Sequence, residues 1–225
     1  MTSATSATSL LHLLQFASPA LPIGAYSYSQ GLETAIDTGL VSDAASARDW
    51  IARCLDQVQA RWDGPVLWRM MAALADGDAA SFAMWSERFI ASRDCAEPRA
   101  ETIQMGYSLG RLLDELRPES AAQWGSETCL PAAFARAVHL FGIDPRQAVA
   151  ASLFGWVENQ VLVCVKSVPL GQVAGQRLLL SLAPDIEAAA ALACSLADED
   201  LCNWTPGLSL LAMRHEVQHG RLYRS

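Results

Sequence analysis

Residues 145–182 read PRQAVAASLFGWVENQVLVCVKSVPLGQVAGQRLLLSL, and this nearly continuous apolar stretch decides the fold. Its middle part, residues 157–168, is rich enough in β-branched residues to form a buried strand. A lone strand would leave its backbone N–H and C=O groups unpaired, and no other part of the chain offers a strand to pair with it. We therefore predict that the stretch is helical and that Pro169-Leu170-Gly171 divides it into two helices.

Helical periodicity continues on both sides of this stretch. It predicts helices over residues 10–17, 26–39, 66–74, 79–92, 98–116, 131–141, 185–196 and 206–216. A further long helix starts at the N-cap Ser42 or Asp43 and is expected to break or kink at Gly64-Pro65. Residues 1–9 repeat Thr-Ser-Ala with nothing to bury, so we expect a disordered tail. The predicted fold is all-α: one domain over residues 1–225, a single compact helical bundle of about ten helices.

Composition narrows the class of protein. The formal net charge is −8 at pH 7, so a surface that binds nucleic acid is not expected. Apolar residues make up 52% of the chain and charged residues only 18%, which favours apolar surface reserved for partner proteins.

The same residues indicate where the protein works. No Lys or Arg precedes Arg48, so residues 10–17 lack the basic start of a signal peptide. The sequence contains no uninterrupted apolar run of about 18 residues, so we predict no membrane span. The cysteines lie far apart without a CxxC pair, as is typical of buried thiols in a reducing compartment. We expect a cytoplasmic protein with no membrane partner.

Residues 215–219, HEVQH, fit the HExxH pattern of zinc metalloproteases. A catalytic zinc needs a third protein ligand, which in such enzymes follows downstream. Only six residues follow His219, and none is Asp, Glu, His or Cys. P-loop, GxGxxG and GxSxG motifs are also absent. We interpret the pattern as a chance match and predict no catalytic residue, no metal site and no cofactor.

Basic residues are unevenly used. Lys166 is the only Lys among 16 basic residues, and it follows a strongly apolar run. It is either a compact cation with a specific role or a side chain whose aliphatic stem is buried while its ammonium group stays in water. The last residues hold Arg214, Arg221 and Arg224, interleaved with Tyr223, which is either an interface composition or a frayed end.

Four segments together resemble the UreF family of urease accessory proteins. Residues 18–33, SPALPIGAYSYSQGLE, are close to the family's SPxLPIGxFSxSxGLE. Residues 99–106 match its R-x-E-T…MG element, and residues 166–172, KSVPLGQ, match its lysine ahead of PLGQ. Residues 215–225, HEVQHGRLYRS, resemble its HE-x-Q-[YF]-SRLFRS ending, from which His219, Gly220 and Tyr223 depart.

The resemblance implies a helical homodimer that is not itself an enzyme. It implies pairing with the accessory protein UreD (also called UreH), recruitment and regulation of the GTPase UreG, and docking on urease apoprotein during nickel insertion. The alternatives are a direct nickel carrier that uses His215 and His219, and a zinc metalloprotease.

The resemblance also suggests site residues. The expected partner-binding residues are Arg221, Leu222, Tyr223, Arg224, Ser225, His215, Glu216 and Gln218. Control of the GTPase is expected at Lys166. A dimer or partner surface is expected at Pro22, Gly24, Tyr26, Ser27, Tyr28, Gly31, Glu33, Arg99, Glu101 and Thr102.

Overall fold

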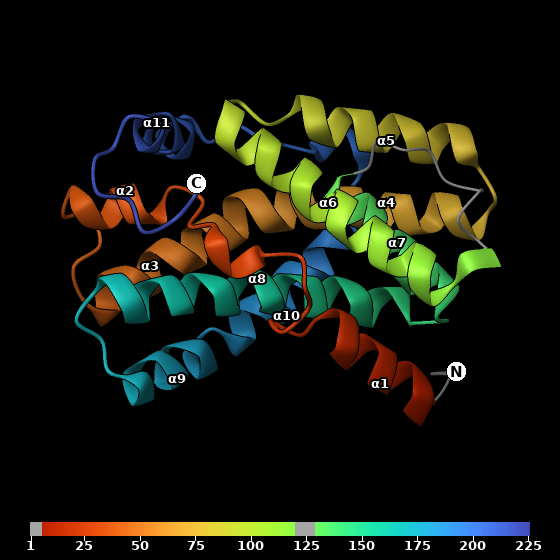
Figure 1. The fold of residues 1–225 in the computed structure, drawn as a ribbon, viewed down its shortest axis with the longest axis horizontal. Coiled ribbons are helices and arrows are strands. Elements are labelled where there is room, and N and C mark those ends of the chain that lie inside the picture. The colour runs from red at the N-terminus through yellow and green to blue at the C-terminus, as the bar shows by residue number, and fades with distance from the viewer. Residues whose placement is uncertain (1–5, 120–128) are drawn as a thin grey trace.

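A computed structural model describes residues 6–119 and 129–225 (Figure 1). The helices are α1 Ala7–Phe16, α2 Leu32–Asp37, α3 Ala44–Cys54, α4 Gly64–Ala75, α5 Ala79–Ala91, α6 Ala96–Leu116, α7 Leu130–Leu140, α8 Pro145–Ser167, α9 Gln172–Ser181, α10 Ala183–Ala193 and α11 Pro206–His215. A π-helical segment, Leu55–Asp63, joins α3 to α4 without a break, so the described residues form ten separate helices. They contain no strand, and the prediction of an all-α bundle of about ten helices is confirmed.

Helix α8 is the apolar stretch that could have been a strand. Asp144 caps it, because its carboxylate accepts the backbone N–H of Gln147 at 2.9 Å, and Pro145 occupies the first turn. The helix ends at Ser167, two residues before Pro169, as predicted. Its buried residues recur at helical spacing, at Val149, Leu153, Val157, Val161 and Cys164. Helix α8 packs against α2, α4, α9 and α10 (Figure 1).

By length and composition alone, α8 could also cross a membrane. Its most apolar window has a mean hydropathy of 1.5, but 44% of that window is buried inside this fold. The core helix of a globular protein passes the same test, and the packing of α8 between other helices accounts for its composition.

The expected break at Gly64-Pro65 does not occur. The chain instead widens into the π-helical segment, and the N–H of Gly64 bonds to the carbonyl five residues back, at Gln59. Pro65 has no N–H to offer the carbonyl of Arg61, and that carbonyl accepts the N–H of Cys202 at 3.2 Å instead. The proline is thus accommodated inside a continuous helix.

Two expectations near the N-terminus need correction. Residues 1–5 lie outside the described part, but the helix begins at Ala7 rather than Leu10, because Ser6 accepts the N–H of Ser9 and caps it. The hydroxyl of Ser9 also donates to the carbonyl of Gly142, so this residue is buried rather than part of a disordered tail. Likewise, the helix expected from residue 26 begins only at Leu32.

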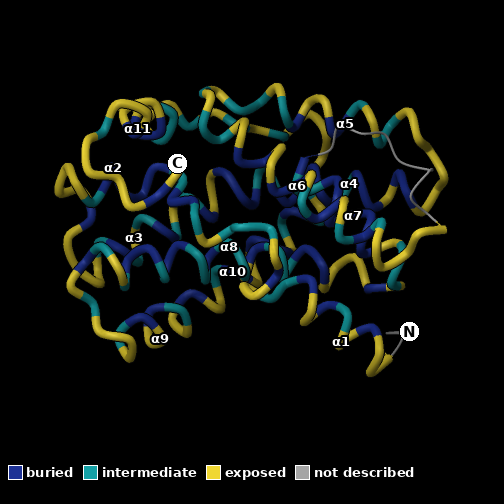
Figure 2. The backbone as a smooth tube through the Cα atoms, in the orientation of Figure 1, coloured by how far each residue is buried: buried dark blue, intermediate teal, exposed yellow. Residues whose placement is uncertain are grey.

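Most of the buried apolar residues form one connected cluster, seen as the dark segments of α4, α7, α8 and α10 in Figure 2. Helices α1, α5, α9 and α11 lie at the periphery with exposed outer faces (Figure 2). The C-terminal tail runs from α11 to the side of α2 and α8 (Figure 1). All four segments that carry the family resemblance meet at this place.

Candidate functional site

The site is a polar network in which the last residues of the chain are fixed. We call it the C-terminal junction, formed by Glu33, Glu97, Glu101, His215 and residues 221–225. Its members come from α2, α6, α11 and the tail, and its hydrogen bonds join residues up to 190 positions apart.

Glu33, in the first turn of α2, holds the tail backbone. Its side chain is almost fully buried. One carboxylate oxygen accepts the N–H of Leu222 at 2.6 Å, and the other accepts the N–H of Tyr223 at 3.1 Å and a nitrogen of His215 at 2.8 Å. A single carboxylate therefore orients the tail and ties it to α11.

His215 is fully buried, and carboxylates lie at both of its ring nitrogens. Nε2 lies 2.8 Å from Glu33 and Nδ1 lies 2.7 Å from Glu97. Each ring nitrogen of His215 is thus within hydrogen-bond distance of a carboxylate oxygen. Arg221 also donates to Glu97, at 2.5 Å, so Glu97 joins the tail to the buried ring of His215.

Ser225 lies at the other end of the junction. Its backbone oxygen accepts the N–H groups of Ser29 and Gln30 at 2.6 and 3.1 Å, and the hydroxyl of Ser29 at 2.5 Å. These donors converge because Gln30 and Gly31 both have positive φ, at 53° and 83°, a conformation that glycine adopts readily. The bend in residues 29–31 thus forms a cradle for the tail.

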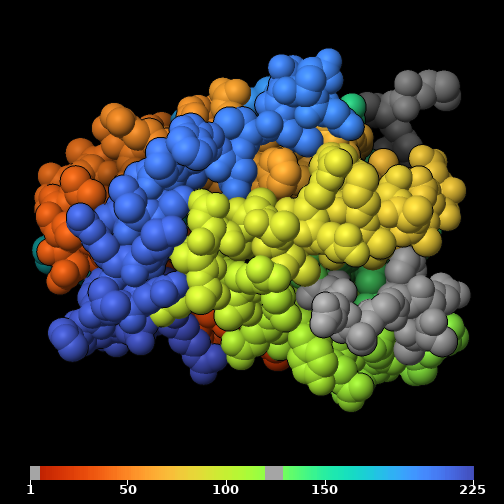
Figure 3. Space-filling model, turned by 90° about the horizontal axis from the view of Figure 1, so that it is seen from above, coloured from red at the N-terminus to blue at the C-terminus, as the bar shows by residue number. Residues whose placement is uncertain are grey.

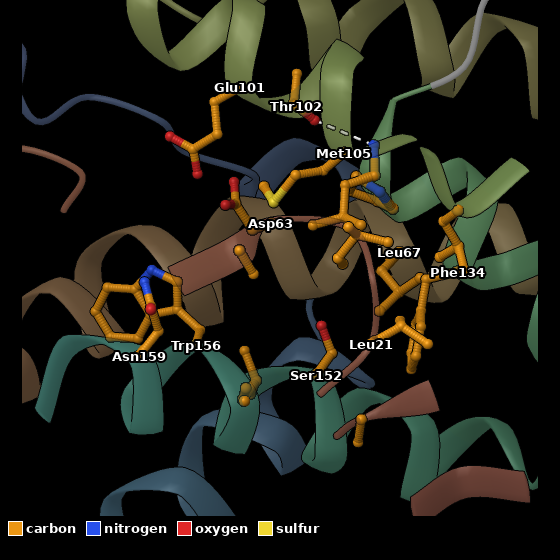
Figure 4. Close-up of a pocket in the computed structure, with 18 of the residues that line it drawn as sticks. Leu21, Asp63, Leu67, Glu101, Thr102, Met105, Phe134, Ser152, Trp156 and Asn159 are labelled. Carbon is orange, nitrogen blue, oxygen red and sulfur yellow. Dashed lines mark hydrogen bonds between the residues drawn. The ribbon is translucent and has the colours of Figure 1, made fainter. Parts of the chain in front are cut away.

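Glu101 joins this cradle to a cavity of about 240 Å³ inside the bundle. Its carboxylate accepts the amide of Gln30 at 2.5 Å and the hydroxyl of Ser225 at 2.8 Å. Burial raises the pKa of Glu101 to about 7, and the hydrogen bonds from Gln30 and Ser225 act in the opposite direction. In Figure 4, Glu101 and Asp63 lie toward one side of the cavity, and Leu21 and Phe134 lie toward the other.

Tyr223 packs its ring into the core, and burial raises the pKa of its phenol. The ammonium of Lys166 lies 5.8 Å from the centroid of this ring, a cation–π arrangement. Lys166 therefore lies beside the tail. The expected GTPase-regulating residue and the expected partner-binding tail form one continuous region.

The residues expected to bind partners divide into two groups. His215, Tyr223 and Ser225 are buried, while Gln218 accepts a hydrogen bond from Thr34 and Glu216 accepts one from the N–H of Ala96. These five stabilise the junction. Leu222 is 72% exposed, and Arg221 and Arg224 are also exposed, so these three can contact a partner.

The residues expected on a dimer or partner surface divide in the same way. Pro22, Tyr26 and Arg99 are exposed, and Gly24 and Ser27 are half-buried. The others lie inside: Gly31 packs against α11, Tyr28 donates to Gln104 at 2.9 Å, and Thr102 accepts the N–H of Leu130 at 3.2 Å. Glu33 and Glu101 belong to the junction.

The HExxH pattern does not form a helical pair of ligands. Helix α11 ends at His215, so residues 216–219 lie beyond it, and His219 is exposed. His215 would have to leave both carboxylates to bind a metal. Within residues 6–119 and 129–225, no group of three or more His, Cys, Asp or Glu side chains is arranged to hold a metal ion.

Sequence reasoning missed several residues of the site. Glu97 was not selected, although it bonds to both His215 and Arg221. Ser29 and Gln30 lay inside a quoted motif without being selected. Trp156 and Gln160 on α8, which donate to Gln30 and to the carbonyl of Ser29, carried no signal.

The fold and the junction define a class: an all-helical protein in which buried carboxylates fix the terminal segment against the bundle. The family model described as UreF matches residues 41–183. The chain is 58% identical to the urease accessory protein UreF of Janthinobacterium sp. (strain Marseille), over 97% of this chain and 99% of that protein. It is 50% identical to the UreF of Nitrosospira multiformis, over 96% and 97%, and 47% identical to that of Azoarcus sp., over 96% and 95%.

The chain belongs to the UreF family of urease accessory proteins. The resemblance noted in four short segments is thereby confirmed over nearly the whole chain.

Proposed function

We propose that this protein is a non-enzymatic scaffold in urease maturation. In this role a homodimer pairs with UreD (UreH), recruits and regulates the GTPase UreG, and docks on urease apoprotein. It acts in the cytoplasm and carries no cofactor of its own, because the nickel is handled by the assembled complex. Family membership supports the role in maturation.

The observation that carries the proposal is the exposed side of the junction. Leu222 projects from a backbone segment that Glu33 holds by two hydrogen bonds, between the charged side chains of Arg221 and Arg224. Arg is enriched among binding hot spots, and Leu222 adds exposed apolar area between two Arg residues. Because the tail segment is already ordered, it loses little conformational entropy when a partner binds it.

The position of Lys166 supports control of the GTPase from the same region. Its ammonium lies over the ring of Tyr223, next to the exposed Leu222. A protein bound to the tail would therefore come close to the only Lys of the chain. The direct nickel-carrier alternative is less well supported, because His215 is already bonded through both nitrogens.

Co-expression with the other urease operon proteins tests the proposal. We expect Leu222→Asp combined with Arg224→Glu to abolish co-purification and urease activation while circular dichroism stays helical. Point changes are preferable to deleting the tail, because a deletion would also take the N–H groups of Leu222 and Tyr223 away from the buried carboxylate of Glu33. Leu180→Asp, a 76% exposed position on α9, is the matched control and should retain both activities. Unchanged co-purification of the double variant would contradict the tail assignment.

A further inference from the structure

A second surface lies away from the buried network, between α11 and the helix formed by α3 and the π-helical segment. It is an open groove of about 470 Å³. Apolar side chains line most of it: Leu40, Trp50, Val58, Leu208, Leu210 and Leu211. Figure 3 shows α11, in blue, lying beside the orange segments of the early helices. Leu40 and Leu210 are each 59% exposed, so apolar surface remains open to solvent.

The charge of this groove is opposite to that of the chain. None of its twelve lining residues is acidic, although the chain has 24 Asp and Glu and a net charge of −8. Two of the lining residues, Arg53 and Arg214, are exposed. Neither forms an ion pair within residues 6–119 and 129–225. The groove therefore presents two cations whose charge is not neutralised by a neighbouring side chain.

Two further parts of the groove lining hold donors without a side-chain acceptor among the described residues. The indole nitrogen of Trp50 is buried and has no hydrogen-bond partner in the described part of the chain. Buried polar groups of this kind are normally paired. Thr205 and Gly207, at the start of α11, also line the groove, and no side chain caps this helix end. A helix N-terminus carries partial positive charge.

We infer that this groove binds an amphipathic segment of a partner protein that carries carboxylates. Apolar side chains of that segment fill the space between Leu40 and Leu210, and its Asp or Glu side chains pair with Arg53 and Arg214. Charge complementarity argues for this occupant. The inference rests on the proposed scaffold role and deepens it by giving the chemistry of one partner segment.

Site-specific photo-crosslinking in the co-expressed complex tests the inference. A photoreactive phenylalanine replaces Leu210, or Leu180 as the control on another face. We expect the position 210 adduct to map to a partner peptide that combines apolar residues with Asp or Glu. Arg53→Glu with Arg214→Glu should reduce its yield about tenfold or more, whereas Arg177→Glu, an exposed position on α9, should not. An adduct to a second copy of this chain, an adduct to a segment without carboxylates, or a complex without any adduct at 210 would overturn the inference.

A second measurement separates this inference from the scaffold role. If no operon protein co-purifies with the native chain, the scaffold role fails, and the groove is tested with a synthetic probe. The probe is a fluorescein-labelled amphipathic peptide with Leu on one face and Glu along its flanks, followed by fluorescence anisotropy. We expect the native chain to bind it about tenfold more tightly than the double Arg variant, and more tightly than the same peptide with Gln for Glu. Equal affinities would overturn the inference.

Discussion

The apolar core and the C-terminal junction are both buried, but they are held by different forces. Around α8 the buried side chains are mostly aliphatic, and their stabilisation is non-directional and scales with the area removed from water. The junction instead buries Glu33, Glu101 and His215, whose desolvation offsets much of their mutual attraction. The core therefore supplies stability, and the junction supplies a defined position for the tail. Three experiments test whether the core and the junction differ in this way.

The largest effect is expected in the core. Leu153 on α8 is 1% exposed, and Leu153→Ala leaves a cavity among rigid helices. We expect the free energy of unfolding to fall by about 2–5 kcal/mol in urea denaturation. Leu180→Ala, at the exposed α9 position, should change it by less than about 0.5 kcal/mol. A loss below about 1 kcal/mol for Leu153→Ala would show that the core around α8 is loosely packed.

The second effect depends on pH and tests Glu101, the residue at which the junction meets the cavity. Because the pKa of Glu101 is raised from 4.5 to about 7 in the fold, the folded chain binds more protons than the unfolded chain between these values. The contribution of Glu101 to stability therefore falls as pH rises from 4.5 to 7, by an amount on the order of 3 kcal/mol at most.

Glu101→Gln removes this titration and keeps the shape of the side chain. Relative to the native chain, the variant should thus be more stable at pH 8 than at pH 5, as measured by urea denaturation at both values. Glu115→Gln, on the exposed side of α6, controls for the charge change. A native-to-variant difference that does not depend on pH would mean that Glu101 is ionised across the range.

The smallest effect on global stability is expected from Glu33→Gln. The amide cannot accept at both ends, so at least one donor among His215 and the N–H groups of Leu222 and Tyr223 loses its partner. The tail can then detach into water, so we expect unfolding to change by only about 1 kcal/mol. Amide exchange at Leu222 and Tyr223 should accelerate about tenfold. A loss as large as that of Leu153→Ala, with no selective change in the tail, would mean that the junction is part of the core.

Most of the fold was predictable because its signals are local. The period of apolar residues and the cap at Asp43 predicted helices that the structure contains. The predictions were wrong where a contact with a distant part of the chain determines the local structure. Pro65 stays inside a helix because the chain widens before it and Cys202 takes the free carbonyl, and Ser9 is ordered because Gly142 lies next to it.

The site was less predictable for the same reason. Family resemblance selected most of its residues, but no local pattern shows that Glu33 receives the backbone of residues 222 and 223. His215 and Tyr223 were selected as contact residues, yet their burial follows only from how α2, α6 and α11 come together. Sequence reasoning therefore located the region and could not separate its supporting side chains from its exposed ones.

The π-helical segment has a consequence at a distance. Its free carbonyl at Arg61 holds Cys202, and the side chain of Asn203 donates to the carbonyl of Ser92 at 2.8 Å, so the linker before α11 is anchored to the bundle. These anchors share no residue with the junction. Opening of the tail can therefore proceed back to His215 and stop there, leaving α11 docked. The π-helical segment near residue 60 thus limits how much of the C-terminal end can detach from the bundle.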